Sequence, residues 1–150
     1  MHTGSTAPDF ALPDETGTER RLSTLLADGP VVLYFYPAAM TSGCTAESCH
    51  FRDLAAEFAE LGAARVGISP DGVEKQATFA STHNLDFPLL SDRDGAVADQ
   101  FGVRRRLGPL PTKRQTFVID TDRTLLAVIK SEVRMGVHAD RALRTLRERQ

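Results

Sequence analysis

A continuous apolar run near the start of the chain limits the possible folds more than any other feature. The run reads Val31-Val32-Leu33-Tyr34-Phe35-Tyr36 and is bounded by Gly29-Pro30 and by Pro37. It is short, rich in β-branched and aromatic residues, and free of polar alternation, which is typical of a strand buried on both faces of a sheet. We therefore predict a central strand over residues 31–36.

The segment after this strand has the periodicity of a helix. Apolar residues recur at helical spacing from Ser42 to Leu61, and Gly62 ends the pattern. A second unit of the same kind follows, with a strand over residues 65–69, a turn at Pro70-Asp71-Gly72 and a helix over residues 73–83. This alternation of strands and helices predicts a parallel α/β layer.

The second half of the chain contains five further expected elements. Residues 87–90 are a candidate strand, residues 95–101 a short helix, and residues 139–149 a last helix with Ala142, Leu143 and Leu146 facing inward. Residues 116–120 and 125–129 flank a four-residue turn, which is the pattern of an antiparallel hairpin. We expect an α/β fold with a central mixed β-sheet flanked by helices on both faces. Because 150 residues is a common domain size, we also expect a single domain over residues 1–150.

Composition and charge argue against several classes of function. Hydrophobic residues make up 41% of the chain and charged residues 25%, which is ordinary for a globular protein. A formal net charge of −2 gives no bulk attraction to nucleic acid or to anionic membranes. The longest apolar run, residues 30–40, is about half of the ~20 residues that span a bilayer. Residues 1–9 lack the pattern of a secretory signal, so we expect a cytoplasmic protein that binds neither nucleic acid nor membranes.

The only two cysteines, Cys44 and Cys49, lie at the start of the predicted helix. Thr41 suits the N-cap of this helix, which places Cys44 in the first turn. There the free backbone N–H groups and the positive end of the helix dipole favour a thiolate, the reactive form of cysteine. In a reducing compartment such cysteines are more often inert, metal-bound or redox-active than joined in a structural disulfide.

The spacing of the two cysteines does not suit a disulfide in an intact helix. Cys49 follows Cys44 by five residues, so ideal helical geometry separates their Cα atoms by ~8.7 Å. A disulfide requires a Cα separation of ~4.4–6.8 Å. We therefore hypothesise a thiol switch in which the first turns of the helix unwind when the cysteines are oxidised.

Two other interpretations of the cysteines compete with a redox role. Free cysteines are often buried as small hydrophobic residues, and this stays open for Cys49 next to Phe51. It is weaker for Cys44, which follows the carboxyl end of a central strand, where open α/β sheets place their sites. The four histidines, His2, His50, His83 and His138, are scattered or adjacent to a cysteine, so we expect no metal site and no cofactor.

Two short motifs resemble those of a known family. Pro37-x-x-x-Thr41-x-x-Cys44 resembles the signature of the peroxiredoxins, and residues 44–49 are similar to the C-T-x-E-x-C run of the peroxiredoxin Q branch, also called bacterioferritin comigratory protein. The likeness extends to residues 7–12, 66–69, 87–92 and 114–120. It implies a thioredoxin-like fold and the reduction of hydroperoxides by a cysteine.

The resemblance also implies roles for individual residues. Cys44 would be the peroxidatic cysteine, which becomes a sulfenic acid, and Cys49 the resolving cysteine, which forms a disulfide with it. Thr41 would hydrogen-bond the reacting oxygens, and Pro37 would shield the sulfur from water. Arg114 would stabilise the charge that moves onto the leaving oxygen, because a guanidinium offers several fixed donors at once.

Two further positions and a basic run are also of interest. Glu47 either braces Arg114 from the helix or is an ordinary exposed helical residue. Family members often carry proline where Ser42 stands, so we expect this first turn to unwind more easily here. The basic run Arg104-Arg105-Arg106, together with Lys113, is either a docking surface for a reductant or a set of solvated charges.

The expected partners follow from the same resemblance. They are a peroxide, either hydrogen peroxide or an organic hydroperoxide, and thioredoxin or a similar dithiol reductant, with a monomer favoured over a dimer. A thioredoxin-like disulfide oxidoreductase is the first alternative, although such proteins usually have C-x-x-C and a proline where Gln115 stands. A redox sensor or nucleic-acid-binding module is the second, but acidic residues interrupt the basic footprint.

Overall fold

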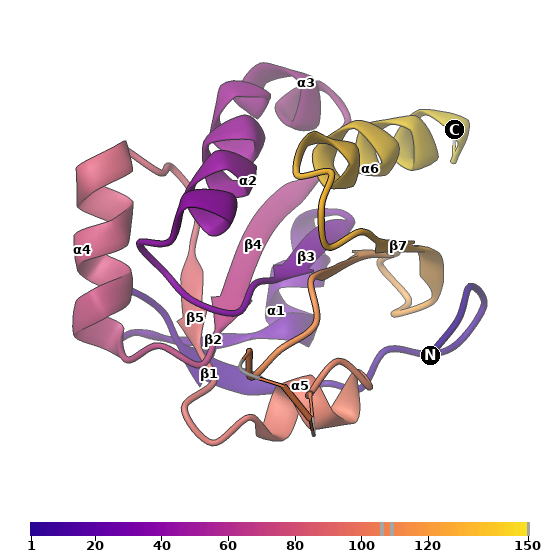
Figure 1. The fold of residues 1–150 in the computed structure, drawn as a ribbon. Helices are drawn as coiled ribbons and strands as arrows, with labels where there is room; N and C mark the ends of the chain where they lie inside the picture. Colours follow the sequence, from indigo (N-terminus) through magenta and orange to yellow (C-terminus); the bar gives the residue numbers. More distant parts are fainter. Residues whose placement is uncertain (106, 109, 150) are drawn as a thin grey trace.

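The computed structural model describes residues 1–105, 107–108 and 110–149 and is built around a five-stranded mixed sheet (Figure 1). The strands follow the spatial order β5-β4-β3-β6-β7. The central strand β3 is parallel to β4, which is parallel to β5, whereas β6 is antiparallel to both β3 and β7. Their bounds are β3 (Val31–Phe35), β4 (Ala64–Ser69), β5 (Leu89–Ser91), β6 (Gln115–Ile119) and β7 (Leu125–Lys130).

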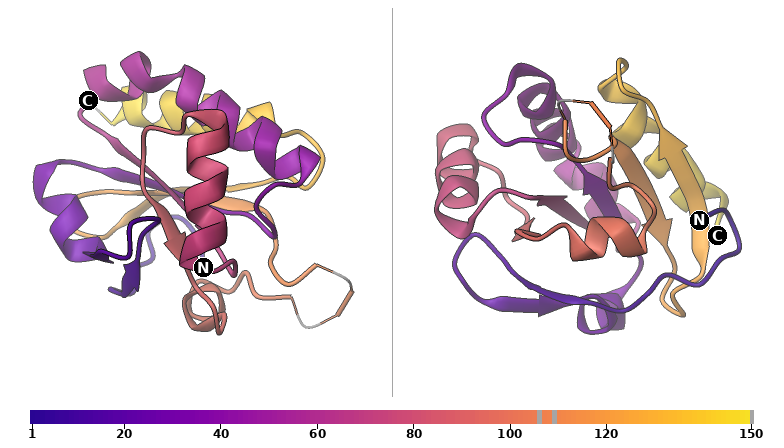
Figure 2. Two further views of the ribbon diagram at one scale, coloured as in Figure 1. Left: turned by 90° about the vertical axis from the view of Figure 1, so that its left-hand side faces the viewer. Right: turned by 60° about the horizontal axis from the view of Figure 1, so that its bottom comes forward.

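Helices cover both faces of this sheet (Figures 1 and 2). One face carries α2 (Ser42–Asp53), α3 (Ala55–Glu60), α4 (Val73–His83) and α6 (Gly136–Glu148). The other face carries α1 (Leu22–Leu25), which continues as a 3₁₀ turn over Leu26–Asp28, and α5 (Ala96–Gln100). A small hairpin of β1 (Ala11–Pro13) and β2 (Glu19–Arg21) lies beside β5. The expected mixed sheet with helices on both faces is confirmed.

The apolar run of the central strand supplies both cores. Every residue of β3 is buried. Because successive side chains of a strand point to opposite faces, Val31, Leu33 and Phe35 pack with α1 and α5. Val32 and Tyr34 pack against the four helices of the other face. The sheet is thus stabilised by apolar burial on both faces, as the run of residues 31–36 predicted.

The prediction of one helix from Ser42 to Leu61 is wrong, because the helix breaks at Leu54. The backbone of Leu54 leaves helical geometry, with φ −97° and ψ 20°. Arg65 on β4 donates from Nη1 to the carbonyl oxygen of Phe51 at 2.9 Å, and that carbonyl would accept from Ala55 in a continuous helix. A tertiary hydrogen bond therefore replaces a helical one at the break.

The other elements agree with the sequence to within a few residues. The helix over residues 73–83 and the hairpin of β6 and β7 are confirmed. The strand expected at residues 87–90 begins later, at Leu89, and α6 begins at Gly136, three residues before the expected start. The β1–β2 hairpin and α1 were not expected from the sequence. Arg106 of the basic run and Pro109 lie outside the described residues.

The pairing of β3 with β6 places two distant segments at one edge of the sheet. Phe35, near the end of β3, lies opposite Gln115, the first residue of β6. The strands are antiparallel, so the residue before β6 emerges beside the loop that leads from β3 to α2. Arg114 therefore reaches the first turn of α2.

Candidate active site

Cys44 lies in the first turn of α2 and is fully buried. Thr41 occupies the N-cap position, with an extended backbone and a carbonyl oxygen that accepts from the amide of Thr45 at 2.9 Å. The Thr41 side chain does not cap the helix. Its Oγ1 donates instead to the carbonyl oxygen of Ala38 at 2.7 Å, which corrects the expectation of a side-chain cap. The first turn of α2 thus lacks one stabilising contact that Thr41 would otherwise provide.

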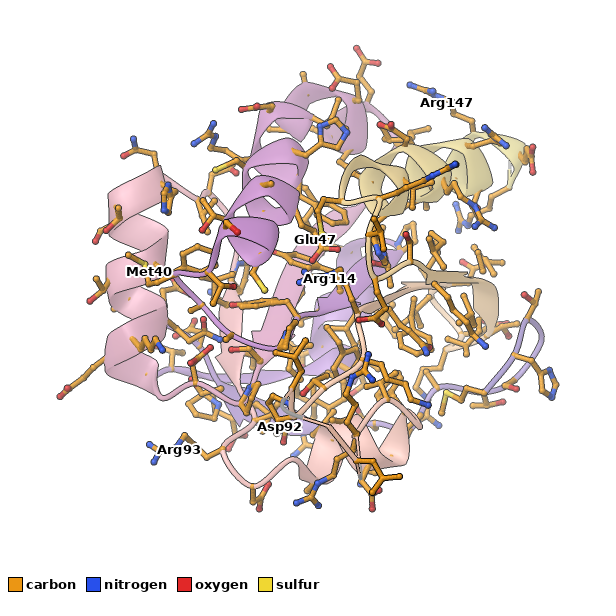
Figure 3. All side chains as sticks on the ribbon, in the orientation of Figure 1. Met40, Glu47, Asp92, Arg93, Arg114 and Arg147 are labelled. Atoms are coloured by element: carbon orange, nitrogen blue, oxygen red, sulfur yellow. The ribbon has the colours of Figure 1, made fainter. Side chains whose placement is uncertain are left out.

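Arg114 joins Cys44 to Glu47 in the interior. Its Nη2 lies 3.3 Å from the Cys44 Sγ, and its Nη1 donates to the Glu47 Oε1 at 2.8 Å. The Arg114 side chain comes from the segment before β6 and meets Glu47 below α2 (Figure 3). A Cβ atom at Gly43 would lie 3.4 Å from the Arg114 Nη2, which is van der Waals contact, so the guanidinium packs directly against the first turn of α2. The guanidinium is thus held between a thiol and a carboxyl.

Glu47 is buried, with only 1% of its surface exposed. The alternative that it is an ordinary exposed helical residue is therefore wrong. Burial raises the pKa of the Glu47 carboxyl to about 8, although the charge of Arg114 and its hydrogen bond act in the opposite direction. Burial alone would lower the pKa of Arg114, but Glu47 and Cys44 beside it raise that pKa above its ordinary value. The guanidinium therefore stays charged.

His138 on α6 completes this buried group, and the sequence analysis missed it. The His138 Nδ1 lies 2.8 Å from the Thr116 Oγ1, and its Nε2 lies 2.8 Å from the Ser131 carbonyl oxygen. Since a carbonyl can only accept, Nε2 carries the proton and Nδ1 accepts from Thr116. The same Nε2 is 3.6 Å from the Glu47 Oε2. Burial lowers the pKa of His138. The hydrogen bond to Ser131 raises this pKa and the charge of Arg114 lowers it, and the net effect is a lowered pKa that keeps the ring uncharged.

A signal for His138 was present in the sequence. Four-residue steps along a helix stay on one face, and His138 precedes Ala142 and Leu146 in such steps. Both of these residues were expected to face inward and are buried, as is Leu143. A histidine on the inward face of an otherwise apolar stripe requires a buried polar partner.

The loop between β3 and α2 is held by the segment that follows β4. Pro37 is buried, and the amide of Ala39 donates to the Asp71 Oδ2 at 2.6 Å. Met40 follows with a left-handed backbone, φ 66°, which is unfavourable for a residue with a side chain. It lies on the outer side of this loop, with 45% of its surface exposed (Figure 3). Asp71 thus fixes the segment that carries Pro37 and Thr41.

Cys49 lies on the same unbroken helix as Cys44 and is half-buried. Both cysteines are free. The helix around Cys49 is tied to its surroundings on both sides. The buried Ser48 Oγ is 2.7 Å from the Tyr34 hydroxyl, and the His50 Nε2 is 2.9 Å from the Asp140 Oδ1 on α6. Unwinding that reaches Ser48 must break its contact with Tyr34.

The described part of the basic run lies next to this site. Arg104, Arg105 and Lys113 line an open cavity of about 520 Å³. Arg105 pairs with the Glu132 Oε1 at 3.1 Å, and the Glu132 Oε2 accepts from the backbone amide of Arg114 at 2.9 Å. Arg105 is therefore engaged in an ion pair, so the run is not wholly a set of solvated charges.

Within residues 1–105, 107–108 and 110–149, no three His, Cys, Asp or Glu side chains come close enough together to hold a metal ion. In the same part of the chain, no helix combines the length and the apolar character needed to cross a bilayer.

Comparison with known proteins places the chain in a family. Residues 3–128 match the AhpC/TSA family. Peroxiredoxin Bcp of Bacillus subtilis is 39% identical over 153 aligned residues, which cover 99% of this chain and 96% of the relative. The crystal structure of peroxidoxin BcpB from Mycobacterium tuberculosis is 66% identical, superimposes with a TM-score of 0.96, and matches 100% of this chain and 99% of that chain.

A further solved structure shows the same fold. A structure of the Xanthomonas campestris bacterioferritin comigratory protein, solved in work on its alkyl peroxide reduction activity, is 31% identical with a TM-score of 0.85. The match covers 93% of this chain and 91% of that chain. The fold is thioredoxin-like, as shown by the mixed sheet with its flanking helices and by the likeness to these solved structures. The chain is a thiol-dependent peroxidase, an oxidoreductase that belongs to the AhpC/TSA family and, within it, to the peroxiredoxin Q or bacterioferritin comigratory protein branch.

Proposed function

We propose that Cys44 is the peroxidatic cysteine. Its thiolate attacks the distal oxygen of a hydroperoxide, the O–O bond breaks, and the leaving alkoxide or hydroxide takes up a proton, so that the products are a Cys44 sulfenic acid and an alcohol or water. The observation that carries this assignment is the 3.3 Å contact between the Arg114 Nη2 and the Cys44 Sγ. A cation held at the sulfur favours the thiolate over the thiol.

Arg114 acts in this step as a preorganised donor. During attack, negative charge moves from sulfur to the leaving oxygen, and a fixed guanidinium stabilises this charge without rearranging. The hydrogen bond from Nη1 to Glu47 keeps the guanidinium plane in place. Thr41 hydrogen-bonds the reacting oxygens after its hydroxyl turns away from Ala38, and the buried Pro37 shields the sulfur from water.

Cys49 is the resolving cysteine in this proposal. Its thiolate attacks the sulfenic sulfur of Cys44, the S–S bond forms, and hydroxide leaves and is protonated to water. Both residues lie on one intact helix, where ideal geometry separates their Cα atoms by ~8.7 Å. The first turns of α2 must therefore unwind before the bond forms. The N-terminus of α2, which has no side-chain cap, is where this unwinding begins.

The remaining assignments complete the catalytic cycle. The protein reduces hydrogen peroxide and organic hydroperoxides, and thioredoxin or a similar dithiol returns the Cys44–Cys49 disulfide to two thiols. Alkyl peroxide reduction by the Xanthomonas relative supports the organic substrates. We further propose that the chain acts in the cytoplasm as a monomer and that residues 1–150 form one domain.

Steady-state peroxide consumption with thioredoxin, thioredoxin reductase and NADPH tests this proposal. Cys44→Ser should abolish consumption, because it removes the thiol that Arg114 contacts. Cys49→Ser should consume one equivalent of peroxide and then stop. Rapid reduction of insulin disulfides without any peroxide consumption would instead favour a disulfide oxidoreductase. Full turnover by Cys49→Ser would indicate a mechanism with one cysteine.

A further inference from the structure

One buried cation lies between two buried acidic groups. Arg114 is 6% exposed, Glu47 is 1% exposed, and Cys44 is fully buried. Each acidic group contacts a different nitrogen of the guanidinium. Nη1 lies 2.8 Å from the Glu47 Oε1, and Nη2 lies 3.3 Å from the Cys44 Sγ. A thiolate and a carboxylate would thus share a single positive charge.

Burial makes one anion per cation the favourable arrangement. Two like charges around one cation in a dry site repel each other, and desolvation penalises each charged form. When Cys44 is a thiolate, the Arg114 charge is already balanced, so a proton on Glu47 is favoured. When oxidation converts the thiolate into an uncharged sulfenic acid, Arg114 is left with Glu47 as its partner.

We infer that Glu47 releases its proton when Cys44 is oxidised, so that the buried Arg114 has one counter-ion before the reaction and one after it. The inference deepens the proposed function and rests on the assignment of Cys44 as the peroxidatic cysteine. Before the reaction the counter-ion is the thiolate, and afterwards it is the Glu47 carboxylate. Glu47 touches neither peroxide nor sulfur and acts through Arg114.

The proton balance of the oxidation step follows directly. Thiolate, hydroperoxide and protonated Glu47 yield sulfenic acid, alcohol and the Glu47 carboxylate. The S–O bond forms, the O–O bond breaks, and the proton that the leaving alkoxide needs is matched by the one that Glu47 gives up. No proton is then drawn from bulk solvent in the net reaction.

The second oxygen of Glu47 supports this assignment. The Glu47 Oε2 is buried and has no hydrogen-bond partner among the described residues. An oxygen without a donor is more costly on a carboxylate than on a protonated carboxyl. The His138 Nε2 lies 3.6 Å from this oxygen but bonds to the Ser131 carbonyl oxygen instead. Burial raises the pKa of Glu47 to about 8, which is consistent with a proton on this carboxyl at neutral pH.

The other groups that face Glu47 do not change charge in this step. Arg114 stays charged because its pKa is raised, and His138 on α6 stays neutral because its pKa is lowered by burial. Burial also raises the pKa of Tyr34 on β3 well above its ordinary value, so its hydroxyl keeps its proton. Glu132, after β7, is exposed and paired with Arg105. Of the groups around Arg114, Glu47 and Cys44 are the pair whose charges are exchanged.

Proton uptake per oxidised Cys44 tests the inference. The Cys49→Ser protein, which stops at the sulfenic acid, is mixed with one equivalent of hydrogen peroxide in weak buffer containing a pH indicator. Well below pH 8 we expect almost no proton uptake, and well above pH 8, where Glu47 is already ionised, one proton per Cys44. Uptake of a full proton per Cys44 at every pH would overturn the inference.

A second variant identifies the group that releases the proton. Glu47→Gln in the same background cannot release a proton and should take up one proton per Cys44 at low and high pH alike. Glu132→Gln, a matched control that removes another carboxylate hydrogen-bonded to Arg114, should keep the wild-type profile. If the Cys49→Ser protein takes up the same number of protons at each pH with and without Glu47→Gln, the inference is contradicted. If Cys44 is not oxidised at all, it is the proposed function that fails, and mass spectrometry of the product distinguishes the two failures.

Discussion

The Nη2 of Arg114 lies 3.3 Å from the Sγ of Cys44, although 70 residues separate them in the sequence. The antiparallel pairing of β6 with β3 produces this contact, because Gln115 lies opposite Phe35 at the end of the central strand. Helix α2 thus positions the sulfur of Cys44, and the segment that enters β6 positions the guanidinium of Arg114. Changes at either residue, or in the first turns of α2, have predictable consequences.

Replacing Arg114 by lysine should slow peroxide reduction strongly. A lysine ammonium is a single point charge and cannot hold Cys44 and Glu47 with a rigid two-ended donor. Loss of one preorganised donor typically lowers such rates ~10²–10³-fold. Stopped-flow measurement of Cys44 oxidation gives the rate, with Arg105→Lys as the control in the adjacent loop. A rate close to that of the wild type would contradict the role of Arg114.

Ser42→Pro should slow disulfide formation without slowing peroxide attack. Ser42 is the first residue of α2, where proline fits, and Thr41 before it has the extended backbone that proline requires, with φ −93° and ψ 156°. A compatible proline stabilises the fold by about 0.4–1 kcal/mol. If that energy must be overcome on unwinding, disulfide formation slows ~2–5-fold. Mass spectrometry of samples quenched at successive times gives the rate of disulfide formation, and Ser42→Ala serves as control. If Ser42→Pro is stabilised but forms the disulfide at the wild-type rate, unwinding does not involve the first turn of α2.

Ser48 and Tyr34 should show strong energetic coupling. Their hydroxyls are 2.7 Å apart and both residues are fully buried. Ser48→Ala leaves the Tyr34 hydroxyl without a partner, which costs about 1–3 kcal/mol, whereas removing both hydroxyls is close to neutral. Urea unfolding of Ser48→Ala, Tyr34→Phe and the double variant measures the free energies of unfolding. If the double variant loses as much free energy of unfolding as the two single variants together, the hydroxyls do not interact.

Glu47 should make the folded state less stable as the pH rises toward 8. Its folded pKa is about 8 and its ordinary pKa is 4.5, so the folded state binds more protons between these values. The contribution of the Glu47 carboxyl to the free energy of unfolding is fully present below about pH 4.5 and is lost as the pH rises to about 8. In this range the free energy of unfolding falls by at most about 1.4 kcal/mol per pH unit. His138 acts in the opposite direction below its ordinary pKa of 6.5, because burial lowers its folded pKa.

The comparison is therefore cleanest above pH 6.5, where His138 is largely uncharged in both states. Wild type should lose stability from there to pH 8, and Glu47→Gln should lose less. Urea unfolding at several pH values measures the difference. Parallel curves for the two proteins would show that the Glu47 carboxyl does not titrate in this range.

The elements built from local patterns could be predicted from the sequence. The apolar run of β3 and the α4 helix over residues 73–83 have the expected positions because each is specified by its own residues. The break at Leu54 could not be predicted, since it depends on Arg65 of β4 reaching the Phe51 carbonyl. The short β1–β2 hairpin has three residues per strand, too few for a clear alternating pattern.

The candidate site was only partly accessible from the sequence. The first-turn position of Cys44 followed from the strand–turn–helix pattern, but its contact with Arg114 joins two segments, and only the family resemblance pointed to it. Thr41 was expected to cap α2 because threonine commonly does so, yet its hydroxyl bonds to Ala38. His138 stood out only as a lone histidine, because its partners, Thr116 and Ser131, belong to other segments of the chain.

In the proposed mechanism Cys44, held beside Arg114, is the sulfur that peroxide oxidises first. Mass spectrometry of peptides after rapid mixing with one equivalent of hydrogen peroxide shows which sulfur reacts. We expect a sulfenic acid on Cys44 that accumulates in Cys49→Ser, and a Cys44–Cys49 disulfide in the wild type. Oxidation that appears first on Cys49, with Cys44 still a free thiol, would contradict it.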